Sequence, residues 1–421
     1  MKKNALLLTL CILLFNACNK SDTLKEEKTQ SKRVVLAYLF GDINLWEPLL
    51  ENVNQMEEGA PLKEEGTLLV YLDWSPSATQ FRAPVLLEIS RDDTKSIVSR
   101  IVHTYPKDQD AGNPDVFASV LKQVTEEYPA DSYGLIMGGH GNGWIVSPPT
   151  TESKSIGNSE RINGKNLDID KLANAIPASL HFDFIAFHAC LMAEAATLYE
   201  LKDKCDYMVA SVELLPGYGF PYHLATKYLF TQPHADLSNF IKTTTNYYDN
   251  DVNKNEIGYY TLGLYRMDKM EHLAQVTQKC MEALPISYDE MRKEIWNDVA
   301  NSQNDTLMVY PWPKMIPLSK TNKSFYDFCT LCDLVRKYNE ALGYELMAAV
   351  DDVVRIKNEV LGTGIVTDVF QNYVYSSQGM SFYIPNGMVS PALDKAFYER
   401  FGWSKSAGFT QEKDQYISAQ K

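Results

Sequence analysis

Short runs of apolar residues alternate along the first half of the chain with stretches whose apolar residues recur every three or four positions. Five runs have the length and composition of buried strands. They cover residues 34–39, 67–72, 133–138, 182–188 and 207–211. Between them, residues 113–129 show one apolar helical face that begins after Asn113 and stops near Tyr128-Pro129. This alternation predicts an α/β fold with a mainly parallel sheet flanked by helices.

The pattern changes after Pro216. Residues from about 237 to 357 are mostly helical in periodicity, with a proline-rich interruption at 310–313. A late apolar run at 379–385 predicts one more strand, and residues 394–403 predict a further helix. The C-terminal half is therefore expected to be largely helical.

Composition narrows the class of protein. Of 421 residues, 45% are hydrophobic, enough for a large core, and the formal net charge is −14. No basic cluster is present, so the charge argues against nucleic acid as a partner. The length allows two or three average domains or one large α/β domain.

The first residues have the form of an export signal. Lys2 and Lys3 precede a short apolar stretch at 5–15, too short to be a stable membrane span. The stretch ends at Phe15-Asn16-Ala17-Cys18, which resembles a bacterial lipobox with Phe15 in place of the usual leucine. We expect a signal peptide at 1–18, lipidation of Cys18 and a flexible polar tether at 19–32. The alternative is an ordinary cleaved signal in which Cys18 is incidental.

Five cysteines remain after the leader. This odd number in a long chain does not indicate a disulfide framework. They are Cys190, Cys205, Cys280, Cys329 and Cys332. Cys329 and Cys332 form a lone CxxC in a segment of helical periodicity, without a second pair or a nearby histidine, so a structural role is favoured over a redox or metal role.

Two of the apolar runs end in residues that can do chemistry together. His140 follows the run at 133–138, and Cys190 follows the run at 182–188. Neighbouring parallel strands present their carboxyl ends at one edge, where a thiol and an imidazole form a nucleophile–base pair. The backbone N–H groups of Gly141 and Cys190 are candidates for an oxyanion hole. The order, with the histidine fifty positions before the cysteine, is that of caspases and indicates a cysteine peptidase.

Other features near these residues leave alternatives open. His188 precedes Cys190 by two positions and would share its face along a strand, so it is an alternative base or a pocket residue. No third, orienting carboxylate can be named, so a dyad is expected. The polar loop at 147–165 is either a cleavable loop or a solvated connector. The segment 213–222 combines glycines, prolines and aromatic residues that could wall a pocket.

With these motifs in place, the chain resembles the clostripain family of cysteine peptidases, relatives of caspases and gingipains. The resemblance covers roughly residues 33–403 and includes the segments 140–144, 189–192, 210–213, 216–219 and 381–385. It implies a caspase-like fold at 33–405, followed by a tail at 406–421, with His140 and Cys190 as the catalytic pair. Family members often cut after arginine or lysine. Several mature by cleavage between the two catalytic strands, which here means 147–165. Some need calcium, although the sequence itself requires no cofactor and suggests no metal ligands.

Two departures from the family pattern concern the substrate pocket. The family usually has Asp-Ala-Cys where this chain has His188-Ala189-Cys190, and often has Pro-Gly-Asp-Gly where Tyr218 replaces the aspartate. Both aspartates are credited with holding a basic substrate side chain, and a buried cation needs a paired charge. Glu213 remains as a substitute. With His188, Glu213 and Tyr218 as pocket residues, we expect the preference for arginine or lysine to be weakened or lost, and self-cleavage at Lys154, Arg161 or Lys165 with it.

The sequence thus predicts an exported cysteine endopeptidase that acts on peptides or proteins. We expect a monomer anchored by lipid to the bacterial envelope, at the outer membrane. One alternative is a catalytically silent peptide-binding protein on the same fold. The other is a structural or glycan-capturing surface lipoprotein.

Overall fold

The structure, a computed structural model, describes residues 30–41, 45–73, 80–145, 167–250, 260–301, 325–360, 379–386 and 391–415. The predicted leader with Cys18, most of the tether and the polar loop at 147–165 lie outside these residues. Within them, no helix is both long and apolar enough to cross a membrane.

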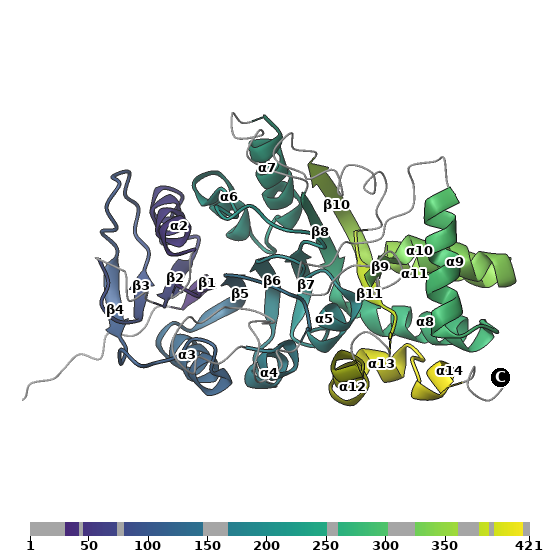
Figure 1. Ribbon diagram of the computed structural model, residues 1–421. Coiled ribbons are helices and arrows are strands. Elements are labelled where there is room, and N and C mark those ends of the chain that lie inside the picture. The colour runs from purple at the N-terminus through teal and green to yellow at the C-terminus, as the bar shows by residue number, and fades with distance from the viewer. Residues whose placement is uncertain are drawn as a thin grey trace, which may run out of the picture.

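A nine-stranded sheet forms the centre of the molecule (Figure 1). Its strands run in the order β10-β8-β7-β6-β5-β1-β2-β3-β4, and β9 and β11 form a separate two-stranded sheet. The strands are β1 (Ser31–Leu39), β2 (Thr67–Leu72), β3 (Val85–Glu88), β4 (Arg100–Thr104), β5 (Ala130–Gly138), β6 (Phe182–His188), β7 (Cys205–Ala210), β8 (Tyr260–Arg266), β9 (Phe325–Asp327), β10 (Val354–Val360) and β11 (Ser381–Tyr383). The five central strands β2, β1, β5, β6 and β7 are parallel, and the outer strands pair antiparallel. The predicted mainly parallel α/β sheet is confirmed.

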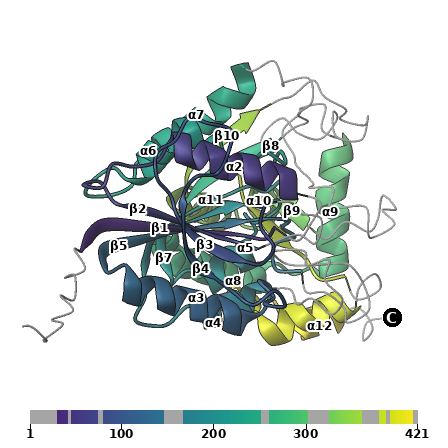
Figure 2. The same ribbon diagram turned by 90° about the vertical axis from the view of Figure 1, so that its left-hand side faces the viewer.

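Helices cover both faces of the sheet (Figure 2). They are α2 (Trp46–Glu58), α3 (Pro114–Glu127), α4 (Ile169–Ala175), α5 (Ala195–Glu200), α6 (Tyr222–Leu229), α7 (Leu237–Asn250), the 3₁₀ turn η2 (Met267–Lys269), α8 (Met270–Ala283), α9 (Tyr288–Asn301), α10 (Phe328–Tyr338), α11 (Glu340–Val353), α12 (Pro391–Arg400), α13 (Gly402–Ser406) and α14 (Gln411–Gln415). Helices α2, α6 and α7 pack on one face, and α3, α4, α5 and α8 on the other. In β1, Val35 and Ala37 face the first group while Val34 and Leu36 face the second, which is why parallel strands buried on both faces are continuously apolar.

The helix predicted at 113–129 shows how local sequence sets an element. Pro114 occupies the first turn, where its missing N–H is not needed, and the side chain of Asn113 accepts the N–H of Asp115 at 3.1 Å. Its apolar face, which includes Phe117 and Val124, is buried in the core. The prediction of this helix is confirmed.

The region from 237 to 357 is only partly as predicted. It contains the expected helices, but it also supplies β8 and β10, which extend the main sheet on one side. In β10, apolar Val354, Ile356 and Val360 fall on one face by the period of two, which Asn358 interrupts, as is common in an edge strand. The late run at 379–385 does contain a strand, β11, but β11 pairs with β9 and not with the main sheet.

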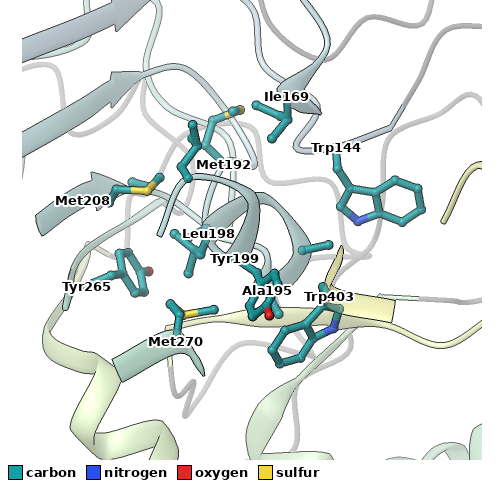
Figure 3. Close-up of a cluster of buried hydrophobic side chains, with 14 of the residues drawn as sticks. Trp144, Ile169, Met192, Ala195, Leu198, Tyr199, Met208, Tyr265, Met270 and Trp403 are labelled. Atoms are coloured by element: carbon teal, nitrogen blue, oxygen red, sulfur yellow. The ribbon is translucent and has the colours of Figure 1, made fainter. Parts of the chain in front are cut away.

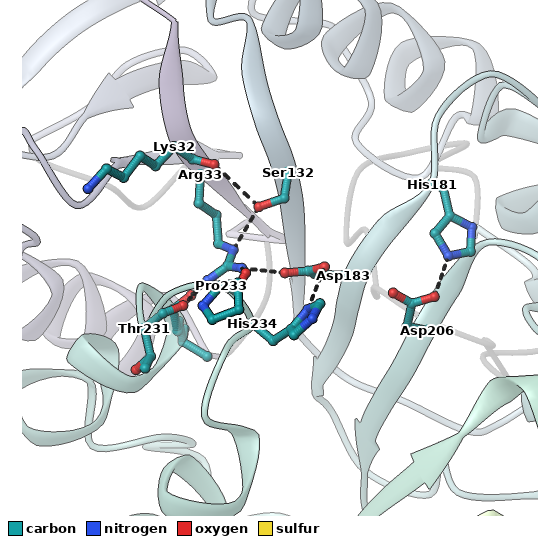
Figure 4. A network of polar contacts seen from close by, with 10 residues as sticks. Lys32, Arg33, Ser132, His181, Asp183, Asp206, Thr231, Pro233 and His234 are labelled. Carbon is teal, nitrogen blue, oxygen red and sulfur yellow. Dashed lines mark hydrogen bonds and ion pairs between the residues drawn. The ribbon is translucent and has the colours of Figure 1, made fainter.

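A buried ion pair fastens the amino ends of the central strands (Figure 4). Arg33 in β1 is fully buried and its guanidinium pairs with Asp183 in β6. Its remaining N–H groups donate to Ser132 Oγ at 3.0 Å and to three carbonyl oxygens of the segment 229–233 at 2.6–3.0 Å. Every N–H group of the guanidinium therefore has a hydrogen-bond acceptor, as a buried cation requires.

Candidate active site

The two residues expected to do chemistry follow neighbouring strands. Strand β5 ends at Gly138 and β6 ends at His188, and these two residues are paired in the sheet register. His140 and Cys190 each come two positions later, on adjacent loops at the carboxyl edge of the sheet. The N–H of Gly139 donates to the carbonyl of His188 at 3.1 Å and ties the two loops together at their base.

Gly141 lets the histidine loop approach the cysteine loop closely. A Cβ at Gly141 would lie 2.3 Å from the carbonyl oxygen of Cys190 and 2.9 Å from Cβ of Ala189. Any side chain here would push the loops apart, so the glycine is required by this contact. The close approach keeps the backbone N–H of Gly141 beside the cysteine loop.

The thiol of Cys190 is partly exposed and hydrogen-bonded to the segment after β7. Its Sγ accepts the N–H of Leu215 at 3.2 Å. Burial raises the pKa of Cys190, the Leu215 N–H lowers it and the neighbouring carboxyl of Glu213 raises it. The thiol is thus mostly protonated at neutral pH, so a nucleophilic role needs a base to take its proton. Leu191, next in the chain, has a positive φ of 64°, rare for a residue with a branched side chain and typical of functional turns.

His188 is buried and neutral, and it is not exposed as a base would be. It is buried, and its Nδ1 lies 3.1 Å from the hydroxyl of Tyr222. On the other side the imidazole lies close to the backbone of Gly219, where a Cβ would be 1.6 Å from Nε2. Burial lowers the pKa of His188 to about 4. Of the two roles left open by the sequence, this packing disfavours the base, and the pocket role stays a prediction.

Glu213 is a buried carboxyl beside the thiol. It is 3% exposed, and within the described part of the chain its Oε1 has no hydrogen-bond partner. Burial raises the pKa of Glu213 to about 8. Its backbone carbonyl accepts the N–H of Leu191 at 3.1 Å, which places this carboxyl on the segment that supports the cysteine turn.

Tyr218 lies on the turn between β7 and α6. Its side chain is 57% exposed and that of Leu214 is 51% exposed, so both present apolar surface to solvent near Cys190. The turn is held by Asn52, whose Nδ2 donates to the carbonyl of Tyr218 at 2.7 Å, and by the positive φ of 59° at Gly219. Sequence reasoning found Tyr218 but missed Leu215 and Asn52. Their contacts join segments 25 and 166 positions apart, for which a single sequence carries no signal.

The described residues hold no group of three or more histidine, cysteine, aspartate or glutamate side chains that could bind a metal ion. The CxxC residues Cys329 and Cys332 lie on α10, as their periodicity predicted, and are free thiols together with the three other described cysteines. The calcium requirement implied by the resemblance stays a prediction.

Comparisons with known proteins place the chain among sequences of one family. The model of the Clostripain family matches residues 37–414. Clostripain of Hathewaya histolytica is 26% identical over 224 residues, a match that covers 48% of this chain and 43% of clostripain. The chain thus spans less than half the length of this curated relative.

Solved structures share the fold over nearly the whole chain. An inactive zymogen of a C11 protease from Parabacteroides distasonis has a TM-score of 0.68 and 23% identity, covering 90% of this chain and 99% of the other. A secreted C11 cysteine protease from Bacteroides thetaiotaomicron, bound to an irreversible peptide inhibitor, has the same TM-score and identity and covers 89% and 98%.

Proposed function

The chain belongs to the Clostripain family, and from this membership we propose that it is a cysteine endopeptidase with Cys190 as nucleophile and His140 as general base. The observation that carries the proposal is the placement of both residues two positions beyond the paired ends of β5 and β6. Because the pKa of the Cys190 thiol is raised, attack requires His140 to accept the proton as sulfur reaches the substrate carbonyl carbon.

The rest of the reaction follows from the same residues. Attack produces a tetrahedral oxyanion, which the backbone N–H groups of Gly141 and Cys190 would stabilise. His140 returns its proton to the leaving amine, and an acyl-enzyme remains on Sγ. Water, deprotonated by His140, then hydrolyses the thioester and frees the thiol.

We propose an uncharged residue, and not arginine or lysine, as the preferred side chain before the cut. The two positions at which the family carries pocket aspartates hold His188, neutral because its pKa is low, and Tyr218. The third predicted pocket residue, Glu213, has a pKa raised to about 8 and is mostly uncharged at neutral pH. A buried cationic side chain would find no paired charge here.

A peptide library tests both statements. Wild-type protein and the variants Cys190→Ala and His140→Ala are incubated with a mixed library, with and without calcium and reductant, and cleavage is mapped by mass spectrometry. Cleavage by the wild type alone supports the dyad, and uncharged residues before the cut support the altered pocket. Cleavage by Cys190→Ala would contradict the nucleophile, and strong cleavage after arginine would contradict the pocket.

A catalytically silent peptide-binding protein is the second candidate, favoured by the hydrogen bond that holds the Cys190 thiol on Leu215. In that case no variant or condition gives cleavage, while peptides still bind. A binding measurement on the same library, by isothermal titration, separates this outcome from a protein that recognises no peptide.

We further propose export and lipid anchoring through Cys18, with the protein acting as a monomer. The tether predicted at 19–32 is two residues too long, because β1 begins at Ser31. Support comes from the charged and apolar leader and the lipobox-like sequence at 15–18. Metabolic labelling with a fatty acid should label the wild type and not Cys18→Ser. Equal labelling of both, or none of either, would contradict a lipid on Cys18.

A further inference from the structure

Three large apolar side chains are exposed together at the amino edge of the sheet. The apolar residues of the main core, such as those drawn in Figure 3, are buried. By contrast, Leu62 is 51% exposed, Val98 is 54% exposed and Ile101 is 48% exposed. In the part of the chain that the structure describes, about half of each side chain is therefore in contact with water, which is unfavourable for apolar surface.

The topology brings these side chains to one edge. Helix α2 connects the parallel strands β1 and β2, so it returns the chain to the amino edge, where the turn with Leu62 follows it. Strands β3 and β4 are each antiparallel to the strand before, so β4 also begins at the amino edge. Val98 precedes the start of β4, and Ile101 is its second residue. In Figure 2 this edge is on the left, where β1 begins.

Backbone contacts fix the three residues on the side of the sheet that α2 covers. The N–H of Val98 donates to the side-chain Oε1 of Glu57, near the end of α2, at 2.9 Å. Leu62 follows Glu57 by five positions. Ile101 is paired with Leu87, which belongs to the core beneath α2, and directly paired residues share a face. Leu62, Val98 and Ile101 thus form one surface, called the amino-edge surface below.

The chain enters the fold beside this surface. Ser31 Oγ lies 3.0 Å from Thr67 Oγ1, so the start of β1 touches the start of β2. The N–H of Gly66 donates to the carbonyl of Leu62 at 3.2 Å, and a Cβ at Gly66 would lie 2.3 Å from the carbonyl oxygen of Arg33. The turn that carries Leu62 is therefore packed directly against the start of β1.

This entry point is within reach of the proposed lipid on Cys18. The eleven residues 19–29 separate Cys18 from the first described residue, Gln30. They span at most about 40 Å when fully extended. A linker of this length would keep a bilayer near the amino-edge surface at high effective concentration, so that contacts too weak to act alone can hold.

The charges around the amino-edge surface cancel. The segments 61–65 and 91–101 carry four basic and four acidic residues, although the whole chain has a formal net charge of −14. A strongly charged partner therefore finds no complementary charge here. Apolar side chains within a balanced polar rim fit the boundary between lipid headgroups and acyl chains. The basic residues are Lys63, Arg91, Lys95 and Arg100, and the acidic residues are Glu64, Glu65, Asp92 and Asp93.

We propose that the amino-edge surface rests on the lipid bilayer that holds the chain through Cys18. The inference rests on the proposed lipid anchoring and does not depend on peptidase activity. Strand β1 has nine residues and is about 30 Å long, and the loops of His140 and Cys190 lie at the opposite edge of the sheet. Docking in this orientation turns the candidate active site away from the bilayer and toward substrates in solution.

Two dye positions near the ends of α2 test this orientation. Lys63 follows Leu62, and Glu47 is exposed in the first turn of α2, at the carboxyl edge. Lys63→Cys and Glu47→Cys are each made in lipidated protein that also carries Cys190→Ala, which removes the candidate nucleophile, and are labelled with an environment-sensitive dye. The labelled proteins are reconstituted in phosphatidylcholine vesicles with and without lipids that carry a nitroxide quencher. Peptide mapping verifies which residue carries the dye.

The proposed orientation places only the first dye at the membrane. Helix α2, with 13 residues, is about 20 Å long, whereas interfacial side chains enter only about 5–10 Å into the bilayer boundary. We therefore expect nitroxide lipids to quench the dye at Lys63→Cys at least about threefold more than the dye at Glu47→Cys. Added salt should not change this difference, because the charges of the amino-edge surface cancel.

Two triple variants separate these side chains from apolar exposure in general. Leu62→Ser, Val98→Ser and Ile101→Ser together should abolish the difference in quenching between the two dyes. The matched control replaces three side chains that are 42–45% exposed elsewhere, on α6, α10 and α11, and should leave the difference unchanged. It combines Leu224→Ser, Tyr338→Ser and Tyr344→Ser.

Several results would overturn the inference. Equal quenching at the two dye positions would show that the lipid alone holds the protein, and equal losses in both triple variants would show that the amino-edge surface is not special. A dimer that only the first triple variant dissociates would assign the surface to a second copy of the chain. If the protein does not float with vesicles at all, lipid anchoring fails first and the docking fails with it. Peptide cleavage by the wild type in solution is independent of all these results, so the proposed peptidase activity is tested separately.

Discussion

The two ends of the parallel strands differ in how fully their buried polar groups are hydrogen-bonded. At the amino ends, Arg33 is fully buried and each of its donors has a partner, with Asp183 supplying the opposite charge. At the carboxyl ends, buried Glu213 and Glu194 each keep an oxygen without a standard hydrogen bond among the described residues. A buried polar group with all its hydrogen bonds made adds order to the fold, whereas a buried group that lacks one calls for an explanation.

The charge states of the buried groups also differ between the two ends of the strands. At the amino ends, Arg33 and Asp183 form an ion pair. At the carboxyl ends, burial raises the pKa of Glu194 and Glu213 to about 8 and lowers the pKa of His188 to about 4. All three groups are then mostly uncharged at neutral pH. The comparison predicts that changes at the amino ends alter stability, and that changes at the carboxyl ends alter chemistry and its pH dependence.

Arg33→Ala should give the largest effect on stability. Removing one partner of a buried pair leaves Asp183 without its counter-charge and three carbonyls without donors, so we expect a loss of about 3–5 kcal/mol in the free energy of unfolding. Urea denaturation measures this loss. The kcat/KM of the folded fraction, normalised by titration of reactive Cys190, should equal that of the wild type. A folded but inactive Arg33→Ala would break the comparison.

Gly219→Ala tests the carboxyl ends of the parallel strands. The residue has a φ of 59°, and an added Cβ would lie 1.6 Å from Nε2 of His188. We expect a loss of about 1–3 kcal/mol in unfolding free energy from the strained backbone and a clear fall in kcat/KM as His188 is displaced. Gly217→Ala is the control, since its Cβ would meet only Leu45 at 3.5 Å. Equal losses of stability and kcat/KM in Gly219→Ala and Gly217→Ala would contradict the claim that Gly219 fixes the position of His188.

Glu213→Gln should change how stability depends on pH. Below the ordinary glutamate pKa of 4.5 the carboxyl is protonated in both states, and between 4.5 and about 8 it ionises only in the unfolded chain. The free energy of unfolding of the wild type therefore falls through this window and levels off above it. Glutamine removes the fall, so the variant should gain up to about 4 kcal/mol relative to the wild type between pH 5 and pH 9. Unfolding curves at pH 5, 7 and 9 measure this, and a pH-independent difference would contradict it.

His234→Ala should have the smallest effect on stability. It tests whether burial makes the Arg33–Asp183 pair of the first prediction important. His234 is 76% exposed and its Nδ1 lies 3.9 Å from Asp183, the carboxylate that also pairs with Arg33. Exposed pairs contribute little, so we expect a change below about 0.5 kcal/mol in unfolding free energy. A loss comparable with that of Arg33→Ala would show that burial does not decide the value of the pair.

The sequence predicted the features that depend on local pattern. The apolar runs before His140 and Cys190 placed both residues at strand ends, and Asn113-Pro114 marked the start of α3. Edge strand β10 carries the expected period of two but follows a long helical stretch, and the helical periodicity of its surroundings hid it.

Contacts between distant segments could not be predicted in this way. The hydrogen bond from the Leu215 N–H to Cys190 depends on how separate loops pack. His188 shows the limit most clearly. Its position two residues before Cys190 indicated a possible base, and only its packing against Gly219 and Tyr222 disfavours that role.

The most direct test of the proposed site is to ask which cysteine a peptide electrophile selects. Wild type, His140→Ala and Cys190→Ala would be treated with one equivalent of a peptidyl acyloxymethyl ketone carrying an uncharged residue next to the warhead, and the adduct located by peptide mapping. Burial raises the pKa of Cys280 to about 12 and that of Cys329 well above its usual value, so these thiols should not compete. The account predicts one adduct, on Cys190, that forms much more slowly in His140→Ala and is absent in Cys190→Ala. An adduct on another cysteine, or equal rates with and without His140, would contradict it.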